Sequence, residues 1–429
     1  MIRVEEIESG REAFETARMG EDRFRLDSGG EGRWSRWSYR AANPSLMLKS
    51  NPDGITLLAP GGKRWTNPLD ALAWMDSTTK QEPVDGPPFK GGWLGHLSYD
   101  LGRWFEELPS KAGNDLGWPF FVFAWHERVI AHDGTSGRNY LCSAKAPVPG
   151  NALDFGSSEW PIGWGKFKSN FSREEYERAV VAALEYIAAG DVFQVNLSQR
   201  FEMPMALPPR AVYQRMCGEY PAGFGALLDY GNRALISNSP ELFLQVDGRK
   251  VTTRPIKGTR PRREGMEKEL RASPKDQAEL NMIVDLERND LGRICELGSV
   301  KVTSARDIET LPTVYHGVAT IEGILREDVG LVELLRATFP GGSVTGAPKI
   351  RAMQIIDEVE PVRRGAYCGA IGYLSADGQI GLNIAIRTIV ADEGRAYVSV
   401  GGGIVADSKP AEEYEETMIK AQAMFEVLK

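Results

Sequence analysis

The chain has 429 residues, of which 42% are hydrophobic and 26% charged, so it can bury a large core. Its formal net charge of -8 argues against a general nucleic-acid-binding function, because binding to phosphates requires a basic surface. The 4 cysteines lie far apart, the acidic amino-terminal segment lacks a signal-peptide pattern, and no apolar run reaches the length of a membrane span. We therefore expect a soluble cytoplasmic protein without a disulfide framework.

Tryptophan is confined to the first part of the chain, where all 10 tryptophans lie between Trp34 and Trp164. A Gly- and Pro-rich run at 147–163 closes this part. These features predict a boundary between an amino-terminal, Trp-rich region (1–165) and a second region (166–429). A loop between two halves of one β-sandwich would produce the same change in composition, and the residues favour neither interpretation.

The second region opens with a predicted helix and strand. Ser172 and Glu175 form an S-x-x-E capping box, apolar residues then recur at helical spacing, and Gly190 ends the helix. The segment VFQVNLSQRF (192–201) alternates between apolar and polar residues, which predicts a strand with one polar face that includes Gln194.

The remaining elements indicate the fold class. Strands are predicted at 233–246, 249–257, 367–374, 380–390 and 396–405, and helices at 276–288, 330–338, 348–357 and 410–428. Because strands follow strands instead of alternating strictly with helices, the pattern favours an α+β fold with largely antiparallel sheets over a doubly wound fold.

Acidic residues recur at helical spacing on two of these helices. They are Asp276 and Glu279 on one helix, and Glu413 and Glu416, followed by Lys420, on the other. Carboxylate oxygens without nearby His or Cys suit a hard divalent cation such as Mg²⁺. Spacing alone favours the alternative, a solvated ion pair between Glu416 and Lys420.

Lys257 lies among arginines in the segment TTRPIKGTRPRR (252–263). Neighbouring positive charge and partial burial lower the pKa of an ammonium group, and a decrease of about three units would make the amine nucleophilic at neutral pH. The alternative, which the residues alone slightly favour, is a basic surface loop that binds anions non-specifically. The arginines concerned are Arg254, Arg260, Arg262 and Arg263.

Two glycine-rich turns and one histidine complete the candidate groups. PGGSVTGAPKIRA (340–352) and VGGGIVADS (400–408) present backbone N–H groups that can bind a carboxylate or phosphate. The first turn is not a P-loop, because Ala347 rather than lysine follows Gly346. His316 can act as an acid or base, although a lone histidine is more often structural.

Taken together, these segments resemble the chorismate-utilising enzymes. The resemblance is dense from 166 to 429 and weaker before it. It implies a large, mostly antiparallel two-sheet β-sandwich flanked by helices, with 166–429 as the chorismate-binding catalytic region. The segments that carry it are DVFQVNLSQRF (191–201), SNSPELF (237–243), TTRPIKGTRPR (252–262), AELNMIVDLERNDLGR (278–293), PGGSVTGAPKIRAMQIIDEVEP (340–361), YCGAIGYLS (367–375), NIAIRT (383–388) and GGGIVADS (401–408), with GGWLGHLSYDLGR (91–103) in the first region.

The resemblance also implies a set of site residues. It assigns Mg²⁺ to Glu279 and Glu416, with Asp276 and Glu413 close by. It assigns the enolpyruvyl carboxylate of chorismate to Tyr367 and Arg387. It places His316 beside the departing hydroxyl. Further substrate contacts are implied for the backbone amides of Gly346, Gly401 and Gly403 and for the side chain of Lys420.

Two positions bear on the reaction. Gln194 stands where isochorismate and salicylate synthases have a water-activating lysine, so water is disfavoured as the nucleophile. Anthranilate synthases typically read PIAGT, whereas this chain reads PIKGT, and Lys257 resembles the nucleophile of aminodeoxychorismate synthases. The implied activity is the amination of chorismate to 4-amino-4-deoxychorismate for 4-aminobenzoate and folate synthesis. A separate glutamine amidotransferase subunit would supply the ammonia.

Two alternatives stay open. The first is an anthranilate synthase component that converts chorismate to anthranilate and pyruvate. The second is a non-catalytic, chorismate- or tryptophan-binding regulatory protein. The segment from Asp27 to Trp37 loosely resembles the tryptophan-binding segment of relatives, which bears on the second alternative.

Overall fold

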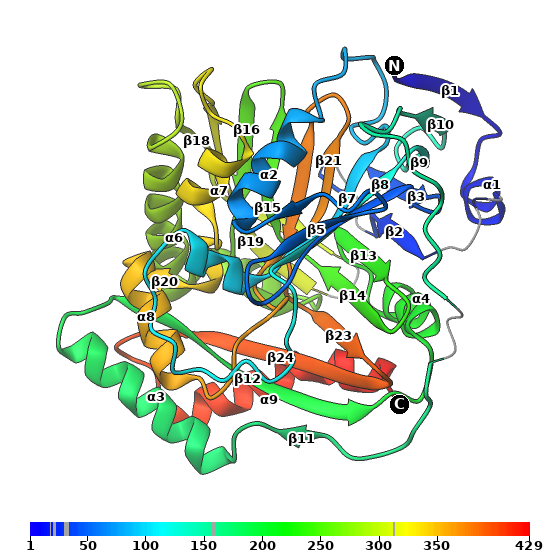
Figure 1. The fold of residues 1–429 in the computed structure, drawn as a ribbon. Coiled ribbons are helices and arrows are strands. Elements are labelled where there is room, and N and C mark those ends of the chain that lie inside the picture. Colours follow the sequence, from blue (N-terminus) through cyan, green and yellow to red (C-terminus); the bar gives the residue numbers. More distant parts are fainter. Residues whose placement is uncertain (18, 20–22, 30–33, 157–159, 312–313) are drawn as a thin grey trace.

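The computed structural model describes residues 1–17, 19, 23–29, 34–156, 160–311 and 314–429. In these residues, two antiparallel sheets of 12 strands each form the fold (Figure 1). Helices flank them, so the predicted α+β fold with antiparallel sheets is confirmed. None of the helices in the described ranges has the length and apolar character needed to span a bilayer.

The first sheet contains the strands that surround the glycine-rich turns. The short strand β20 (Gly346–Ala347) pairs with the first two residues of β12, beside the main path of the sheet. In spatial order the sheet consists of β1 (Arg3–Ile7), β10 (Asn139–Ser143), β9 (Arg128–Asp133), β3 (Trp37–Ala41), β2 (Phe24–Asp27), β13 (Phe224–Asp229), β14 (Arg233–Ser239), β23 (Thr388–Asp392), β24 (Arg395–Ile404), β12 (Gln194–Pro204) and β11 (Lys168–Ser169).

The second sheet carries the strand with Lys257 at one edge. Its β18 (Lys301–Thr310) pairs with β19 beside the main path. In spatial order the sheet consists of β17 (Ile256–Pro261), β19 (Val314–Ile324), β16 (Lys250–Arg254), β15 (Leu242–Asp247), β22 (Ile380–Ile384), β21 (Ala370–Ser375), β7 (Gly92–Leu97), β8 (Phe121–His126), β4 (Leu46–Ser50), β5 (Thr56–Ala59) and β6 (Arg64–Trp65).

Strands from both sides of residue 165 occur in each sheet. In the first sheet β2 pairs with β13, and in the second β7 pairs with β21. The sheets pack against each other through apolar side chains, and the rings of Tyr39 on β3 and Tyr373 on β21 are 5.7 Å apart. The Trp-rich residues therefore belong to the same two sheets as the remainder of the chain, while the predicted boundary at 165 stays a prediction.

The helices begin and end close to the predicted positions because their caps are local. Ser172 Oγ accepts a hydrogen bond from Glu175 N (3.2 Å), and Glu175 Oε2 accepts one from Ser172 N (2.7 Å), which completes the predicted capping box. Gly190 has a φ of 83°, just after the helix ends. These helices are α3 (Arg173–Ala188), α6 (Pro274–Gly292), α7 (Leu331–Thr338), α8 (Lys349–Val359) and α9 (Pro410–Val427).

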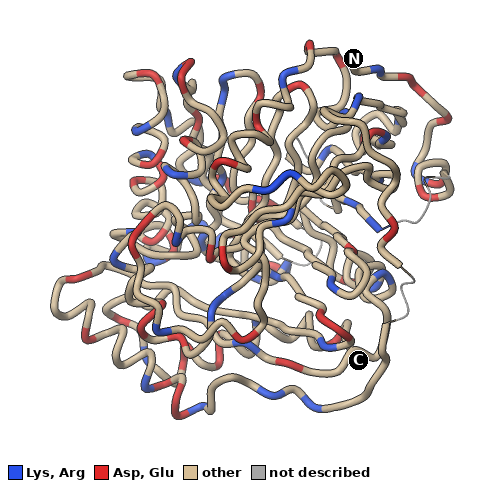
Figure 2. Tube along the Cα trace, viewed as in Figure 1, with Lys and Arg blue, Asp and Glu red and all other residues tan. Residues whose placement is uncertain are grey.

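Figure 1 shows how helices cover the site-bearing strands. Helices α3 and α9 lie along β12 and β24 at the bottom of the view, and α6 flanks β18 and β19 on its left side. Acidic and basic residues are interspersed along the trace (Figure 2). Shorter helical segments are α1 (Arg11–Thr16), α2 (Pro68–Ser77), α4 (Pro209–Glu219), α5 (Met266–Ala272), η1 (Tyr99–Trp104) and η2 (Gly342–Val344).

Two predicted strands were wrong as single strands, because each crosses from one sheet to the other. The segment 233–246 forms β14 and β15, and the segment 380–390 forms β22 and β23. The two crossing points are hydrogen-bonded to each other: Ile384 N donates to Glu241 O (3.0 Å), and Asn238 N donates to Arg387 O (3.0 Å). Periodicity alone does not reveal the crossings, since the residues on both sides remain β-prone.

The strand β12 was correctly predicted, but its polar face is buried. Gln194 is fully buried, and Asn196 and Ser198 are 7% and 5% exposed. In contrast, Phe193, expected to share the apolar face, precedes the strand and is 73% exposed. Polar side chains on a buried face require partners or a ligand, which makes this face a candidate binding surface.

Candidate active site

Lys257 on β17 is surrounded by charged groups from three other parts of the fold. Burial lowers the pKa of its ammonium group, and the carboxylate of Glu279 on α6 opposes this effect. Lys420 on α9 lowers the pKa further, whereas Glu241 and Glu416 raise it. The structure therefore brings Lys257 together with the predicted residues Glu279, Glu416 and Lys420, in an environment whose net effect lowers the pKa of its ammonium group.

Of the two predicted causes of the Lys257 shift, burial is confirmed and arginine crowding was wrong, because neighbouring arginines have other partners. Arg260 pairs with Glu269 (2.8 Å) and Asp276 (3.0 Å). Arg254 pairs with Glu309 and donates from Nε to Thr320 Oγ1 (3.1 Å). Burial and Lys420, not arginine crowding, disfavour the charged form of Lys257.

His316 lies on β19, paired with β17, and is 2% exposed. Its Nδ1 lies 2.8 Å from Thr259 Oγ1, and its Nε2 has no hydrogen-bond partner among the described residues. Burial, with the charge of Arg387, lowers the pKa of His316 to about 3. The imidazole is therefore neutral at pH 7 and is suited to hydrogen bonding rather than to proton donation as an imidazolium.

Glu241, which sequence reasoning did not assign, is the better proton donor. It lies between β14 and β15 and is 4% exposed. Burial raises its pKa to about 7, against the opposing charges of Lys257 and Arg387. Glu241 lies in SNSPELF (237–243), one of the segments that carry the family resemblance. The signal that could have identified it is that it is the single acid in a β-prone segment.

A second buried acid, Glu287, lies within electrostatic reach of Glu241. Glu287 on α6 is 7% exposed and accepts a hydrogen bond from Thr253 Oγ1 (3.0 Å). Burial raises its pKa to about 8, and the charge of Glu241 contributes to the increase. Farther along α6, Asp290 pairs with Lys349 (2.6 Å). None of these residues was identified from the sequence, since a helical acid is usually exposed.

Tyr367 lies just before β21 of the second sheet, and Arg387 lies where the chain crosses from β22 to β23 of the first sheet. Tyr367 is 5% exposed, and the next residue, Cys368, has a φ of 61° and donates from its backbone N to Ala385 O (2.9 Å). Arg387 itself has a φ of 48°. Positive φ at non-glycine residues is costly and concentrates at functional sites. The predicted carboxylate-binding pair thus lies on two linked, strained turns.

The predicted turn at 400–408 was wrong for its glycines, because Gly401–Gly403 lie within β24 and pair with β12. Both glycine-rich segments pack backbone against backbone. At Gly346 (φ 144°) a Cβ would lie 2.1 Å from Gln194 O, and at Gly401 it would lie 2.5 Å from Leu197 O. Gly402, not singled out from the sequence, faces the acids of α9: its Cβ would lie 3.3 Å from Glu413 Oε2. Side chains at these positions would displace strand β12 or the carboxylates.

Gln194 carries buried polar atoms without partners. Neither its Oε1 nor its Nε2 has a hydrogen bond among the described residues, and the amide packs against Gly403, where a Cβ would lie 2.9 Å from it. Buried polar groups are usually satisfied, so this amide is suited to bind a ligand group.

The predicted acidic residues have different partners. Glu416 pairs with Lys420 (2.6 Å), as the surface alternative predicted. Asp276 pairs with Arg260, and Glu413 accepts a hydrogen bond from Ser408 Oγ (2.6 Å). In the ranges that the structure describes, no group of three or more His, Cys, Asp or Glu side chains is arranged to hold a metal ion.

The segment from Asp27 to Trp37 includes residues 30–33, which lie outside the described residues. Asp27 and Ser28 line a cavity of about 270 Å³. The Asp27 carboxylate accepts hydrogen bonds from Arg25 Nε (3.0 Å) and Tyr213 (2.7 Å), so it is satisfied by the protein itself. The resemblance to a tryptophan-binding segment stays a prediction.

Comparison with known proteins identifies the family. Residues 23–426 match the family described as chorismate binding enzyme. The chain is 39% identical over 431 residues to anthranilate synthase component 1 of Thermus thermophilus, covering 94% of this chain and 92% of that protein. It is also 39% identical over 420 residues to aminodeoxychorismate synthase component 1 of Salmonella typhimurium, covering 92% and 90%. The chain belongs to the chorismate-binding enzymes.

A solved structure extends this likeness to the fold. This chorismate-binding enzyme resembles anthranilate synthase component I of Streptococcus pneumoniae with a TM-score of 0.80 at 33% identity, covering 92% of this chain and 93% of that one. The predicted two-sheet architecture is therefore confirmed over most of the chain. Because relatives named for two different synthases are equally similar, identity alone does not select between their reactions.

Proposed function

We propose that this chorismate-binding enzyme is an aminodeoxychorismate synthase component 1, which aminates chorismate at C4 through a covalent bond to Lys257. The observation that carries the proposal is the environment of Lys257: burial lowers the pKa of its ammonium group, and the acid Glu241 lies within electrostatic reach. A neutral amine beside a protonated carboxyl is the pair needed to attack a ring and to protonate a leaving hydroxyl.

Substrate binding follows from the charges of chorismate, which has two carboxylates. Arg387 and Tyr367 would bind the enolpyruvyl carboxylate, since a guanidinium group pairs well with a planar carboxylate. The backbone amides of Gly346, Gly401 and Gly403 would complete this anion site. Lys420, at the carboxylate-rich side of Lys257, adds positive charge near the ring.

The first step would form a bond between Lys257 Nζ and C2 of the ring. The electron pairs of the two ring double bonds shift toward C4, and the C4–O bond breaks. Glu241 supplies a proton, so the hydroxyl leaves as water. His316 Nε2, which has no partner among the described residues, is available to hydrogen-bond the departing oxygen.

The second step would reverse the displacement with ammonia. Ammonia attacks C4, the double bonds return to their original positions, and the C2–N bond to Lys257 breaks. The proton lost by the new amine returns to the enzyme, where the ionised Glu241 can accept it. The product is 4-amino-4-deoxychorismate, and the enolpyruvyl group is retained.

Mg²⁺ is the cofactor that we propose, held by Glu279 and Glu416. Both Asp276 and Glu416 are ion-paired, but the Arg260–Asp276 side chains are only 26% and 15% exposed, whereas the Lys420–Glu416 side chains are 46% and 52% exposed, so the second pair is weaker and more easily opened. Burial raises the pKa of Glu413, which makes it a poorer ligand. Two carboxylates are sufficient, because Mg²⁺ usually keeps several waters and binds through one or two carboxylates together with its substrate. When bound, the ion would neutralise the ring carboxylate of chorismate.

Ammonia would come from a separate glutamine amidotransferase subunit. The relatives are named as component 1 of their synthases, which supports a second component. We propose that the complex acts in the cytoplasm, where its product would be converted to 4-aminobenzoate for folate synthesis.

Product identification tests the proposal directly. The protein is supplied with chorismate, Mg²⁺ and ammonium, and the lyase that converts 4-amino-4-deoxychorismate to 4-aminobenzoate is then added. We expect 4-aminobenzoate only when the lyase is present. Anthranilate formed without the lyase would instead establish the second candidate, anthranilate synthase component 1, which the 39% identity to the Thermus thermophilus protein favours. If chorismate is not consumed, the result would favour a binding or regulatory protein.

A further inference from the structure

Arg364 connects the elements that carry the proposed carboxylate site. Its side chain is 2% exposed. Nη1 donates to Val344 O (2.9 Å), two residues before Gly346, and Nη2 donates to Asn196 O (2.6 Å), two residues after Gln194. One guanidinium group thus binds a backbone carbonyl in each of two segments that carry predicted substrate contacts.

The charge of Arg364 is balanced by Glu360, which contacts the same strand. Arg364 Nε donates to Glu360 Oε2 (3.0 Å), and Nη2 donates to Oε1 (2.6 Å). Glu360 Oε1 also accepts hydrogen bonds from Ser198 N and Oγ, each at 2.8 Å. The bidentate pair therefore anchors the end of α8 to β12 in the buried interior, where such pairs have directional specificity.

The same guanidinium group lies near the aromatic ring of Tyr367. Its central carbon is 6.0 Å from the centroid of the Tyr367 ring and 4.7 Å from that of Tyr99. Tyr367 N also donates to Arg364 O (3.2 Å), so Arg364 and Tyr367 share one turn. The position of Tyr367 relative to β12 therefore depends on Arg364.

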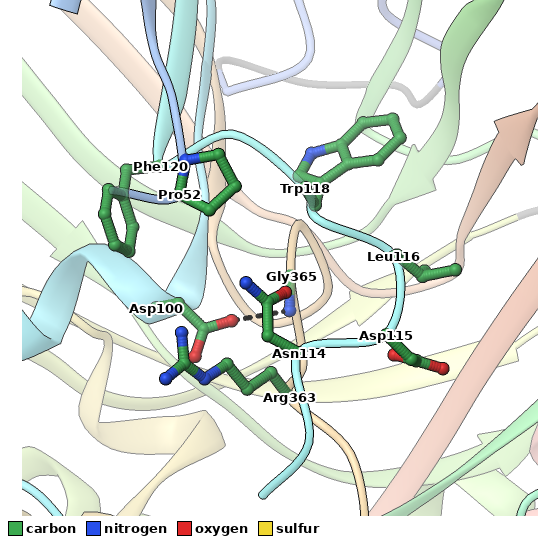
Figure 3. A pocket seen from close by; sticks show the side chains of 9 residues that line it. All are labelled: Pro52, Asp100, Asn114, Asp115, Leu116, Trp118, Phe120, Arg363 and Gly365. Carbon is green, nitrogen blue, oxygen red and sulfur yellow. Dashed lines mark hydrogen bonds between the residues drawn. The ribbon is translucent and has the colours of Figure 1, made fainter. Parts of the chain in front are cut away.

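The turn is also held from its other side. Tyr99 N donates to Gly365 O (2.8 Å), and Asp100 Oδ2 accepts a hydrogen bond from Gly365 N (2.8 Å). Figure 3 shows the Asp100–Gly365 bond beside a small pocket, with Arg363 among its lining residues. Arg364 thus ties the turn to β12 and to the segment before Gly346, and Asp100 ties it to η1.

We propose that Arg364 is a positioning residue for the enolpyruvyl side of the substrate site. It fixes Tyr367, the Gly346 turn and β12 in one arrangement without touching the substrate. The inference rests on the proposed placement of the enolpyruvyl carboxylate at Tyr367. Lysine cannot replace Arg364, because an ammonium group lacks the planar fork that serves two carbonyls and a carboxylate together.

The test compares Arg364→Lys with a matched control, Arg233→Lys. Arg233 has the same kinds of partner: it donates to Asp392 (2.9 Å) and to the carbonyls of Gly117 and Leu116 (3.2 Å each), and it lies over the Trp118 ring. It is at the end of β14 away from the crossing point. The Arg233 side chain is 26% exposed, against 2% for Arg364, so the control matches the kinds of partner and not the burial. Any loss caused by weakening an arginine network in general should appear in both variants.

Binding is measured by titration calorimetry with chorismate and with 4-hydroxybenzoate, a ring carboxylate that lacks the enolpyruvyl group. We expect Arg364→Lys to weaken chorismate binding at least tenfold, to change 4-hydroxybenzoate binding less than threefold, and to lower kcat/KM for chorismate consumption about 100-fold. Arg233→Lys should change each value less than threefold.

Equal losses for both ligands, or chorismate binding within threefold of the original protein, would overturn the proposal. If Arg364→Lys does not fold, Glu360→Gln provides the second test, because it weakens the hold on Arg364 while it keeps both side-chain lengths. It should shift the same affinity ratio in the same direction, and an unchanged ratio contradicts the proposal. Neither affinity depends on which product forms, so these results are separable from the identity of the synthase.

Discussion

Lys420 Nζ lies 2.6 Å from Glu416 Oε1, and the same ammonium group donates to Gly401 O at 2.9 Å. This contact joins α9 to the glycine-rich part of β24. Burial raises the pKa of Glu416, but the charge of Lys420 outweighs it and holds that pKa below its ordinary value. The pair therefore places one positive and one negative charge beside Lys257, with opposite effects on the amine.

Substitutions in this pair should shift the reactivity of Lys257 in opposite directions. Lys420→Gln removes a positive charge, so the pKa of Lys257 should rise and its neutral form should appear only at higher pH. Glu416→Gln removes a negative charge, so the pKa should fall. The measurement is the rate at which a small amine-reactive reagent modifies Lys257 as a function of pH, followed by peptide mass spectrometry. Shifts in the same direction for both variants would contradict this arrangement.

Lys257 should form a covalent adduct with the substrate ring. Incubation with chorismate and Mg²⁺ in the absence of ammonia, followed by denaturation, should give an increase in intact mass that peptide mapping places on Lys257. Lys257→Gln should abolish the adduct and lower the amination rate at least 100-fold. Lys250→Gln is the control, because Lys250 lies on β16, separated from β17 in the sheet by β19, and pairs with Glu322. A full rate without any adduct would indicate direct attack by ammonia.

Glu241 should determine the alkaline limb of the pH profile. Its pKa is raised to about 7, so its protonated, proton-donating form is present below that pH and is lost above it. We expect kcat to fall as pH rises through about 7. Glu241→Gln should remove this limb and lower kcat about 100-fold or more. Glu287→Gln should leave the limb in place. If that variant lost the limb, the limb would belong to Glu287 and not to Glu241.

Glu287 should make the protein less stable as pH rises. Its pKa is about 8 in the folded state, against 4.5 ordinarily, so the folded protein binds more protons than the unfolded one between these values. The free energy of unfolding therefore falls as pH increases through this range. Glu287→Gln should raise stability at pH 9 by on the order of 2 kcal/mol and leave it nearly unchanged at pH 4.5. Urea unfolding at the two pH values provides the measurement.

The Mg²⁺ requirement should distinguish two acids on one helix. Glu279→Gln should increase the Mg²⁺ concentration needed for half-maximal rate at least tenfold, because a proposed ligand is lost. Asp276→Asn should change it less than threefold, since Asp276 is already paired with Arg260 (3.0 Å). Equal effects of the two substitutions would indicate that Asp276 is also a metal ligand.

Local patterns were sufficient to predict most helices and to select several candidate residues, whose roles stay predictions. The Ser172–Glu175 capping box and the helical spacing of Glu413, Glu416 and Lys420 depend on residues within one or two turns, so they can be read directly from the sequence. The resemblance to known enzymes also made Lys257 and His316 candidates, because a motif preserves residue order without requiring knowledge of the surroundings of each residue.

Tertiary structure alone decided the chemistry of these groups. The lowered pKa of Lys257, the raised pKa of Glu241 and the ion pair between Asp276 and Arg260 depend on burial and on contacts between distant segments. The same is true of the crossing of 233–246 between the two sheets. A charge responds to everything packed around it, whereas a sequence pattern records only its neighbours along the chain.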